Sequence, residues 1–293
     1  MRLLAIYLAL LLPASACALP DDQPPKIIFW NMQRHSVEML IHHVPQRDTD
    51  RLAQLKQTFG DLQCKGENLY EQTAGEATNL ICKLPGTTPG SAHETILLIA
   101  HYEHEGKGMS AIDNWTGAMM LPFLYHALAA VPRRHTFVFA EVNGDAGTKT
   151  LFHSMPMVRA VVALEALGLG PASFYIHPIG SVPTFTENLL KTALFRAADE
   201  LGRAAPEASI PGPWFKIDTT REFRYQEIAS ILIHSVSDST RRLPGSVEDT
   251  AARVDSNAYF SSYMLLCCYI VGLDQIPLTE STSQQQSGAG RRR

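Results

Sequence analysis

The sequence has little charge and no excess of basic residues. Of its 293 residues, 18% are Asp, Glu, Lys or Arg, and the net charge is −4. A nucleic-acid-binding protein normally shows a basic footprint, so nucleic acid is not an expected partner. An apolar content of 45% with so few charges is also unlike a disordered chain. The length is sufficient for one large hydrophobic core.

Several common catalytic motifs are missing. The chain has no Gly-x-Ser-x-Gly elbow, no His-Glu-x-x-His helix and no glycine-rich phosphate-binding loop. The stretch Ala-Leu-Gly-Leu-Gly at 166–170 has too few glycines for a dinucleotide-binding fingerprint. The sequence therefore gives no support to serine-hydrolase, His-Glu-x-x-His metalloprotease or nucleotide-binding chemistry.

Cysteine is also scarce, with five in the chain. Cys64 and Cys82 lie in neighbouring strand-like segments, and a disulfide between them suits an oxidising compartment. Cys267 and Cys268 are adjacent in an apolar stretch and are expected to be buried thiols. Zinc binding by these four is not expected, because no second Cys-x-x-Cys-type spacing exists.

The N-terminal segment is typical of a secretory signal peptide. Arg2 precedes an apolar run of about ten residues, followed by Pro13 and small residues. The run is too short for a transmembrane span. We therefore expect residues 1–18 to be removed and the mature chain to be secreted or periplasmic. As an alternative, Cys17 could become a lipid-anchored N-terminus, although Ala-Ser-Ala before it is a weak lipobox.

Apolar strand-like runs alternate with amphipathic helical segments along the chain. Strands are predicted at 61–72, 77–84, 95–102, 135–142, 158–164 and 227–236, and helices at 48–60, 113–130, 146–155, 185–202 and 249–273. This order predicts a single domain over 19–275. Its expected fold is three-layer α/β, a mostly parallel twisted sheet with helices on both faces. The polar segment 276–293 is predicted to be a disordered tail.

Candidate site residues follow the predicted strands. His101 and Glu103 come after one strand and Asp113 opens the next helix, while Glu141 and Glu165 end two further strands. In such folds, ligands bind at the carboxyl ends of the strands. One imidazole and several carboxylates suit a divalent metal with nitrogen and oxygen ligands, zinc first.

Each residue also has a purely structural interpretation. His101 could be a hydrogen-bonded histidine at a strand end, Asp113 a helix N-cap, and Glu141 a solvated carboxylate. Glu165 is harder to explain in this way, because a carboxylate among apolar residues is costly unless it is paired or binds metal. Glu103 lies two residues after His101, on the same strand face, and could support its second nitrogen.

The segments that carry these candidate residues resemble those of the co-catalytic di-zinc aminopeptidases, which are the zinc exopeptidases of the bacterial leucyl aminopeptidase and aminopeptidase Y type. The resemblance runs from about Thr78 to Leu273. "HYE" at 101–103 stands for the family's His-Tyr-Asp, and "SAIDNWTGA" at 110–118 for Gly-Ala-x-Asp-Asn-x-Ser-Gly. "ALEALG" at 163–168 stands for Asn-Leu-Asp-x-x-Gly. The resemblance implies a peptide or aminoacyl substrate.

The resemblance implies that one of the two metal sites is preserved. In the family, one zinc is held by the His of the first strand, a shared Asp and a later Asp, which correspond to His101, Asp113 and Glu165. The other zinc uses the shared Asp, the second residue of a Glu-Glu pair and a last His. Val142 and Gly245 stand at the latter two positions. One zinc ion, not two, is therefore expected.

The family's general base is the first residue of the Glu-Glu pair, which can be aligned in two ways. If "GDAGT" is the turn that follows, the pair becomes Glu141-Val142 and Glu141 is the base. Without the two-residue deletion that this alignment needs, the pair falls on Asn143-Gly144 and both are lost. Two functions follow: a secreted one-zinc exopeptidase-like hydrolase of low activity, or a catalytically inactive binding or scaffold protein. The segment 209–223 is expected to border the cleft.

Overall fold

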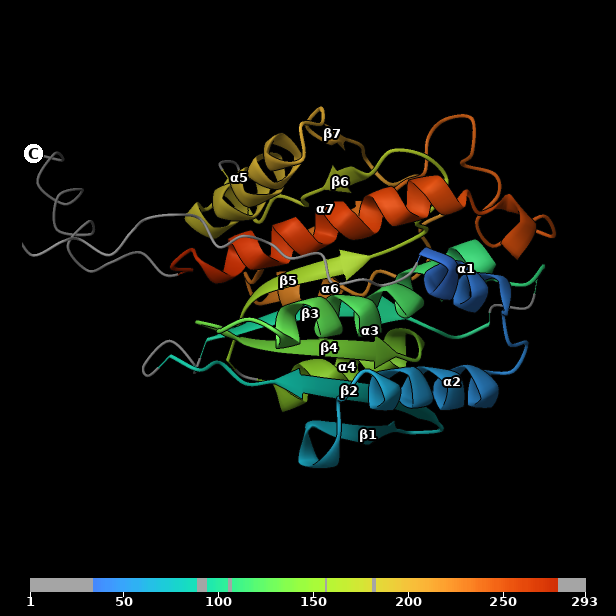
Figure 1. Ribbon diagram of the computed structural model, residues 1–293, viewed down its shortest axis with the longest axis horizontal. Helices are drawn as coiled ribbons and strands as arrows, with labels where there is room; N and C mark the ends of the chain where they lie inside the picture. The colour runs from blue at the N-terminus through green and yellow to red at the C-terminus, as the bar shows by residue number, and fades with distance from the viewer. Residues whose placement is uncertain (1–33, 89–93, 105–106, 156, 181–182, 279–293) are drawn as a thin grey trace, which may run out of the picture.

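The computed structural model (Figure 1) describes residues 34–88, 94–104, 107–155, 157–180 and 183–278. The predicted signal peptide, Cys17 and the tail from 279 onward lie outside these residues. The folded chain reaches Leu278, which is 3% exposed and accepts a hydrogen bond at its carbonyl from Thr186 Oγ1 at 3.2 Å. Ordered packing therefore continues past the expected domain boundary at 275.

One sheet of eight strands runs through the molecule in the order β1-β2-β4-β3-β5-β8-β6-β7. The central strands β4, β3, β5 and β8 are parallel, whereas β1, β2 and β6 join antiparallel toward the two edges. The bounds are Leu69–Ala74 (β1), Ala77–Leu84 (β2), Thr95–His101 (β3), Thr136–Val142 (β4), Val158–Leu164 (β5), Ser173–Tyr175 (β6), Glu207–Ala208 (β7) and Ala229–His234 (β8).

Helices cover both faces of this sheet, which confirms the predicted three-layer α/β fold. In Figure 1, α2, α3 and α7 lie in front of the strands and α4 and α6 lie behind them, while α5, at the upper left, packs against α7 and β8. None of the helices in the described part of the chain has the length and hydropathy needed to cross a membrane. The bounds are Arg34–His42 (α1), Asp48–Asp61 (α2), Thr116–Ala129 (α3), Gly144–Ser154 (α4), Phe185–Glu200 (α5), Arg221–Tyr225 (α6) and Ser256–Asp274 (α7).

The central strand β3 shows why the sequence folds in this way. Its residues 96–100 are all 0% exposed, as expected for a continuous apolar run covered on both faces. Leu98 packs into the core under α3 and α7, whereas Leu97 and Ile99 pack into the core on the side of α4 and α6. The alternation of a strand thus supplies both layers at once.

Several local predictions are corrected. The strand expected at 61–72 begins only at Leu69, because α2 continues to Asp61 and a turn follows. The helix expected over 249–273 is divided into a 3₁₀ turn at Ala251–Arg253 and α7, which is capped by Asp255. The short elements α1, β6, β7 and α6 were not anticipated.

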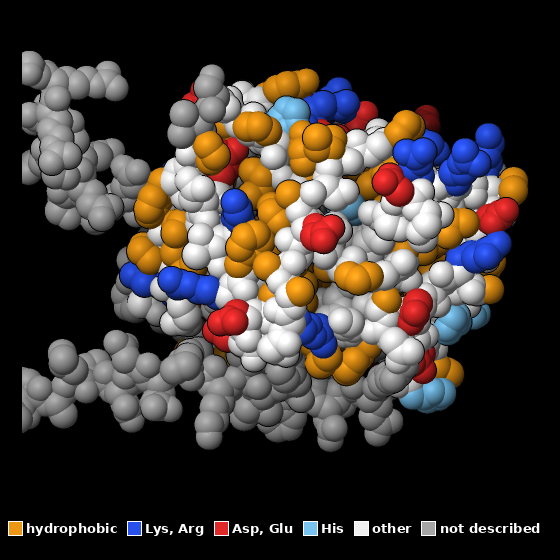
Figure 2. Space-filling model, turned by 90° about the horizontal axis from the view of Figure 1, so that it is seen from above, with side chains coloured by type: hydrophobic (Ala, Val, Ile, Leu, Met, Phe, Trp, Pro, Cys, Tyr) orange, Lys and Arg blue, Asp and Glu red, His pale blue; other side chains and the backbone are white. Residues whose placement is uncertain are grey.

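The cysteine predictions are confirmed within the described residues. Cys64 and Cys82 form a disulfide, which joins the segment after α2 to β2, the second strand of the sheet. Cys267 and Cys268 are free and buried in α7. On the face seen in Figure 2, acidic and basic side chains are interspersed with apolar ones, in keeping with the small net charge of −4.

Candidate metal centre

The carboxyl ends of the parallel strands β3, β4 and β5 meet at one edge of the sheet. His101 is the last residue of β3 and pairs in register with Val142, the last residue of β4. Glu165 directly follows β5, and Asp113 lies in the turn Ala111–Trp115 that precedes α3. The topology therefore collects these side chains at the strand ends, where such folds bind ligands.

Three of the predicted residues converge to form a compact cluster. His101 Nε2 lies 2.8 Å from Glu165 Oε1 and 3.4 Å from Asp113 Oδ1. One nitrogen or oxygen atom from each side chain lies within 4.8 Å of the others. His101, Asp113 and Glu165 are only 1%, 4% and 2% exposed, respectively. The apolar sequence around Glu165 thus correctly indicated a buried carboxylate with polar partners.

The N-cap interpretation of Asp113 is wrong. Its φ of −112° and ψ of 89° are non-helical, and α3 starts only at Thr116. The peptide bond between Asp113 and Asn114 is cis. The Asp113 carboxylate faces His101, with Oδ1 3.4 Å from Nε2, and does not face the first amides of the helix.

Asn114 fixes the turn that carries Asp113 against the segment that carries Glu165. Its Nδ2 donates to the Leu164 carbonyl at 2.9 Å, and its Oδ1 accepts from the backbone N–H of Ala166 at 3.0 Å. These two bonds lie on either side of Glu165 in the chain. The amide side chain thereby holds two of the three cluster residues in a fixed relation, without touching the third.

Glu103 lies beside the second nitrogen of His101, where the sequence placed it. The distance from His101 Nδ1 to Glu103 Oε1 is 3.2 Å, and Glu103 Oε2 accepts from the backbone N–H of Gly144 at 2.9 Å. A carboxylate in this position orients an imidazole and increases its basicity as a ligand. Nε2 is consequently the nitrogen presented to Asp113 and Glu165.

Glu141 is the fourth carboxylate of the region. It is 0% exposed, and neither of its oxygens has a hydrogen-bond partner, so the interpretation as a solvated carboxylate is wrong. Burial raises the pKa of Glu141 well above its ordinary value, and the charge of His101 only partly opposes this rise. A buried carboxylate of this kind is suited to hold or accept a proton.

Charge pairing balances the cluster. Burial, together with the nearby Asp113, raises the pKa of Glu165 to about 8, against the opposing effect of His101. Burial alone would lower the pKa of His101, but Glu165 and Glu103 raise it well above its usual value. In the metal-free cluster both shifts therefore act in the direction of proton uptake.

The donor set fits one divalent metal ion. Glu165 Oε2 is buried and has no hydrogen-bond partner, and Asp113 Oδ1 lies on the His101 side of its carboxylate, so both residues have an oxygen to offer. One imidazole nitrogen and two carboxylates leave a fourth position open, as in catalytic zinc sites. Val142 is an apolar side chain with 0% exposure and Gly245 has no side chain, so these residues do not fit a second ion. Within the described ranges, no other group of three potential ligands converges.

Sequence reasoning missed two residues that hold this centre. Arg51, 0% exposed, donates to the carbonyls of Tyr102 at 2.9 Å and Met109 at 2.7 Å. Asp249 accepts from the backbone N–H groups of Ile112 at 2.6 Å and Asp113 at 3.1 Å. A signal existed for Arg51, because it lies on the helix face that also carries the buried residues Leu55 and Phe59.

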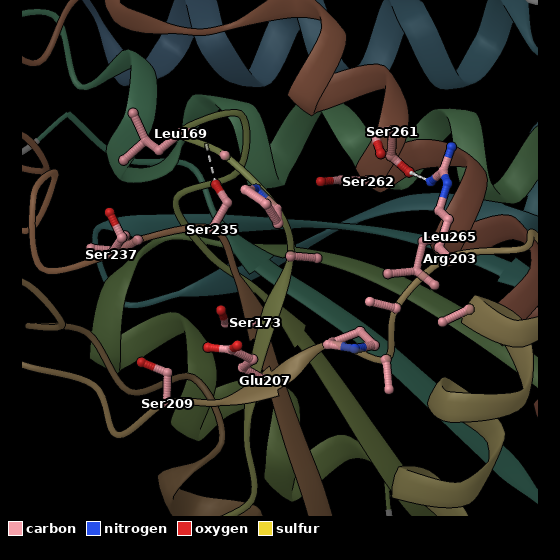
Figure 3. A pocket seen from close by; sticks show the side chains of 18 of the residues that line it. Leu169, Ser173, Arg203, Glu207, Ser209, Ser235, Ser237, Ser261, Ser262 and Leu265 are labelled. Carbon is pink, nitrogen blue, oxygen red and sulfur yellow. Dashed lines mark hydrogen bonds between the residues drawn. The ribbon is translucent and has the colours of Figure 1, made fainter.

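A cavity of about 900 Å³ lies next to β6, β7, α5 and α7 (Figure 3). Ser235, which lines it, donates from Oγ to the Ala166 carbonyl and accepts from the Leu169 N–H, both at 2.8 Å, and so links its wall to the segment that follows Glu165. The three clustered residues themselves do not line it. The labelled serines of its wall are Ser173, Ser209, Ser235, Ser237, Ser261 and Ser262.

Comparison with known proteins finds one family. The sequence model of Peptidase family M28 matches residues 79–252. A search of curated proteins finds no significant match.

Solved structures show the shared fold. The zinc aminopeptidase BSAP from Bacillus subtilis is 15% identical, with a TM-score of 0.56 over 66% of this chain and 49% of its own. The present chain thus spans about half the length of that enzyme. The LapA aminopeptidase of Legionella pneumophila is 12% identical, with a TM-score of 0.64 over 83% of this chain and 70% of its own. A glutaminyl cyclase from an Acidobacteriales bacterium is 15% identical, with a TM-score of 0.64 over 91% and 99%.

Proposed function

The chain belongs to peptidase family M28, and we propose that it is a zinc-dependent exopeptidase-like hydrolase of the aminopeptidase type. Its substrate would be a peptide or an aminoacyl compound. The observation that carries this proposal is the buried cluster of His101, Asp113 and Glu165, whose ligand atoms lie within 4.8 Å of one another. Burying three ionisable groups together is costly unless they serve a common cation or chemical step.

The roles proposed for the side chains combine the family resemblance with the clustering of His101, Asp113 and Glu165. A zinc ion held by His101, Asp113 and Glu165 would polarise the scissile carbonyl and lower the pKa of a water molecule. Glu103 would keep His101 oriented with Nε2 toward the ligand position. Glu141 would take the proton of the attacking water and deliver it to the leaving amine, a role worth about 10²–10⁴-fold in rate. The serine-lined cavity is the candidate binding space for the remainder of the substrate.

The proposal includes one zinc ion and a low turnover. Val142 and Gly245 provide no ligand on the far side of Asp113. A two-metal centre holds both the attacking and the leaving oxygen. A centre with one ion lacks part of that clamp, so we expect slower hydrolysis than in a two-metal enzyme.

The proposed location is outside the cytoplasm. The apolar N-terminal run followed by small residues supports export, and the Cys64–Cys82 disulfide supports an oxidising compartment. A lipid anchor at Cys17 is the alternative to simple secretion. Mass spectrometry of the mature N-terminus would decide between them.

A catalytically inactive binding or scaffold protein is the second candidate. It is favoured by the replacement of two ligand positions by Val142 and Gly245, since the fold persists while part of the chemistry is lost. In that case the cluster around His101 would be retained for stability, and the cavity for binding alone.

Zinc analysis of the purified protein, combined with peptidase assays, tests the proposal. We expect one zinc per chain and slow release of the leaving group from aminoacyl-anilide or peptide substrates. Peptides that begin with glutamine belong in the panel, because a glutaminyl cyclase shares the fold. Glu141→Gln should retain the zinc and lose the activity. A chain with no metal and no hydrolysis across the panel would instead establish the inactive candidate.

A further inference from the structure

The space opposite His101 at Asp113 is taken up by a lysine. Gly245 has a φ of +66°, and a Cβ added there would lie 2.7 Å from Lys216 Nζ and 3.0 Å from Asp113 Oδ2. The ammonium and the carboxylate oxygen thus border the same small volume above this glycine. Lys216 belongs to the loop between β7 and α6, within the segment 209–223 that was expected to border the cleft.

The charge of Lys216 complements the side of Asp113 that faces away from the cluster. Oδ1 faces His101 Nε2 at 3.4 Å, whereas the buried Oδ2 accepts no hydrogen bond. Electrostatic attraction reaches the Asp113 carboxylate from His101 on one side and from Lys216 on the other. Asp113 is therefore held as a carboxylate between two positive groups.

The loop around Gly245 is fixed relative to Asp113. Asp249 Oδ2 accepts from the backbone N–H groups of both Gly245, at 2.8 Å, and Asp113, at 3.1 Å. The same carboxylate oxygen thus links the backbone of Gly245 to the turn that carries Asp113. The volume occupied by the Lys216 ammonium is a fixed feature of the fold rather than an opening between unrelated loops.

We propose that the ammonium group of Lys216 is the second cation of this centre. It balances Asp113 from the side where a two-metal centre would hold its other ion, and its charge excludes that ion. Lys216 is a positioning residue, acting through Asp113. The exclusion of a second ion rests on the proposed one-zinc function. The pairing of Lys216 with Asp113 does not depend on bound metal.

A double-mutant cycle in metal-free protein tests the pairing. Lys216→Met, Asp113→Asn and the double variant are compared by urea unfolding in the presence of a chelator. We expect each single variant to increase the unfolding equilibrium constant. The product of these two increases should exceed the increase in the double variant by about three- to tenfold. Lys216→Arg should restore most of the coupling, and Lys191→Met, on α5 over the ring of Phe195, is the control. Strictly additive effects would overturn the proposal.

Counting metal ions tests the exclusion. Val142→Glu and Gly245→His introduce ligands at the two positions that, by the family resemblance, would complete a second metal site. Histidine is used at position 245 because it is one of the residues that tolerate a positive φ. With Lys216 retained, elemental analysis and cobalt electron paramagnetic resonance should find one isolated ion. With Lys216→Met added, they should find two coupled ions. Equal ion counts in both backgrounds, whether one or two, would contradict exclusion by Lys216. Wild-type protein without any metal would refute the proposed function, while the unfolding cycle would still decide the pairing.

Discussion

The two sides of Asp113 differ sharply although they share one backbone framework. On one side, His101 and Glu165 are 1% and 2% exposed and lie 2.8 Å apart. On the other side stands a glycine, Gly245, and both Lys216 Nζ and Asp113 Oδ2 border the space above it. Asp249 nevertheless bonds both sides, through Ile112 and Asp113 on the one and Gly245 on the other. The backbone framework around Asp113 is therefore continuous across the two sides, and the difference between them lies in the side chains.

This comparison teaches that the loops around the centre are held independently of metal-binding side chains. Strand ends and turns are fixed by long-range hydrogen bonds, such as those of Asn114 to the residues around Glu165. These bonds do not depend on which side chains stand at Val142 and Gly245. The charge of Asp113 still needs compensation on both sides, because an unpaired buried carboxylate is costly.

The largest effect on zinc affinity is expected on the side of Asp113 that carries His101 and Glu165. Glu165→Gln preserves the shape of the side chain and removes its charge, so zinc affinity should fall by more than the ~10–100-fold typical for loss of a supporting residue. Val142→Ala, at the equivalent strand end, is the matched variant and should leave zinc affinity unchanged. Competition with a chromophoric chelator measures both. Equal losses in the two variants would remove the distinction between the sides.

The pH dependence of stability should reverse when zinc binds. Glu165 has a pKa of about 8 in the folded protein and an ordinary value of 4.5, so its contribution to stability is complete below about 4.5 and is lost as the pH rises toward 8. His101, whose pKa is also raised, acts in the same direction. Metal-free protein should therefore lose a few kcal/mol between pH 5 and about 8.

Zinc-loaded protein should behave in the opposite way over the same range. Its ligands must be deprotonated to bind, so the stabilisation by zinc grows as the pH rises. Urea unfolding at several pH values, with zinc or with a chelator, measures both curves. Metal-free stability that is constant or rises over this range would contradict the charge state assigned to Glu165.

A smaller effect is expected for the carboxylate behind His101. Glu103→Gln retains an acceptor for the Gly144 N–H but weakens the support of His101 Nδ1, so zinc affinity should fall by about 10–100-fold. Glu187→Gln is the matched control, because Glu187 is also buried and accepts the backbone N–H of Thr184, but in α5. If both variants bind zinc like the wild type, Glu103 has no role at the centre.

Much of the fold and of the side of Asp113 that carries His101 and Glu165 could be predicted from the sequence. The continuous apolar runs that became β3, β4 and β5 indicate parallel strands, and parallel strands bring their carboxyl ends together. That single rule places His101 and Glu165 near each other without any knowledge of the contacts. The disulfide followed from spacing and compartment in the same manner.

The opposite side of Asp113 could not be predicted in this way. The sequence identified Val142 and Gly245 as missing ligands, but no local pattern connects Lys216 with Asp113. Their proximity depends on the path of the loop between β7 and α6, and β7 itself has only two residues, too few to show a periodicity. The roles of Arg51 and Asp249 were missed for the same reason, since each bonds to backbone groups far along the chain.

The smallest effect on zinc affinity is expected for Asp249, which bonds to the backbone on both sides of Asp113. In Asp249→Asn, one oxygen becomes an NH₂ group, so the side chain can no longer accept from Ile112, Asp113 and Gly245 together. Losing one or two of these bonds should lower the free energy of unfolding by about 1–3 kcal/mol. Because the turn that carries Asp113 loosens only slightly, zinc affinity should fall by less than about tenfold.

Asp255→Asn is the control for this last variant. Asp255 also accepts backbone N–H groups, those of Asn257 and Ala258, but as the N-cap of α7, a position where Asn serves about as well as Asp. Unfolding and zinc titration should both stay close to the wild type. If Asp249→Asn instead lowers zinc affinity as strongly as Glu165→Gln, the backbone that links the sides, and not only their side chains, determines which side of Asp113 can hold metal.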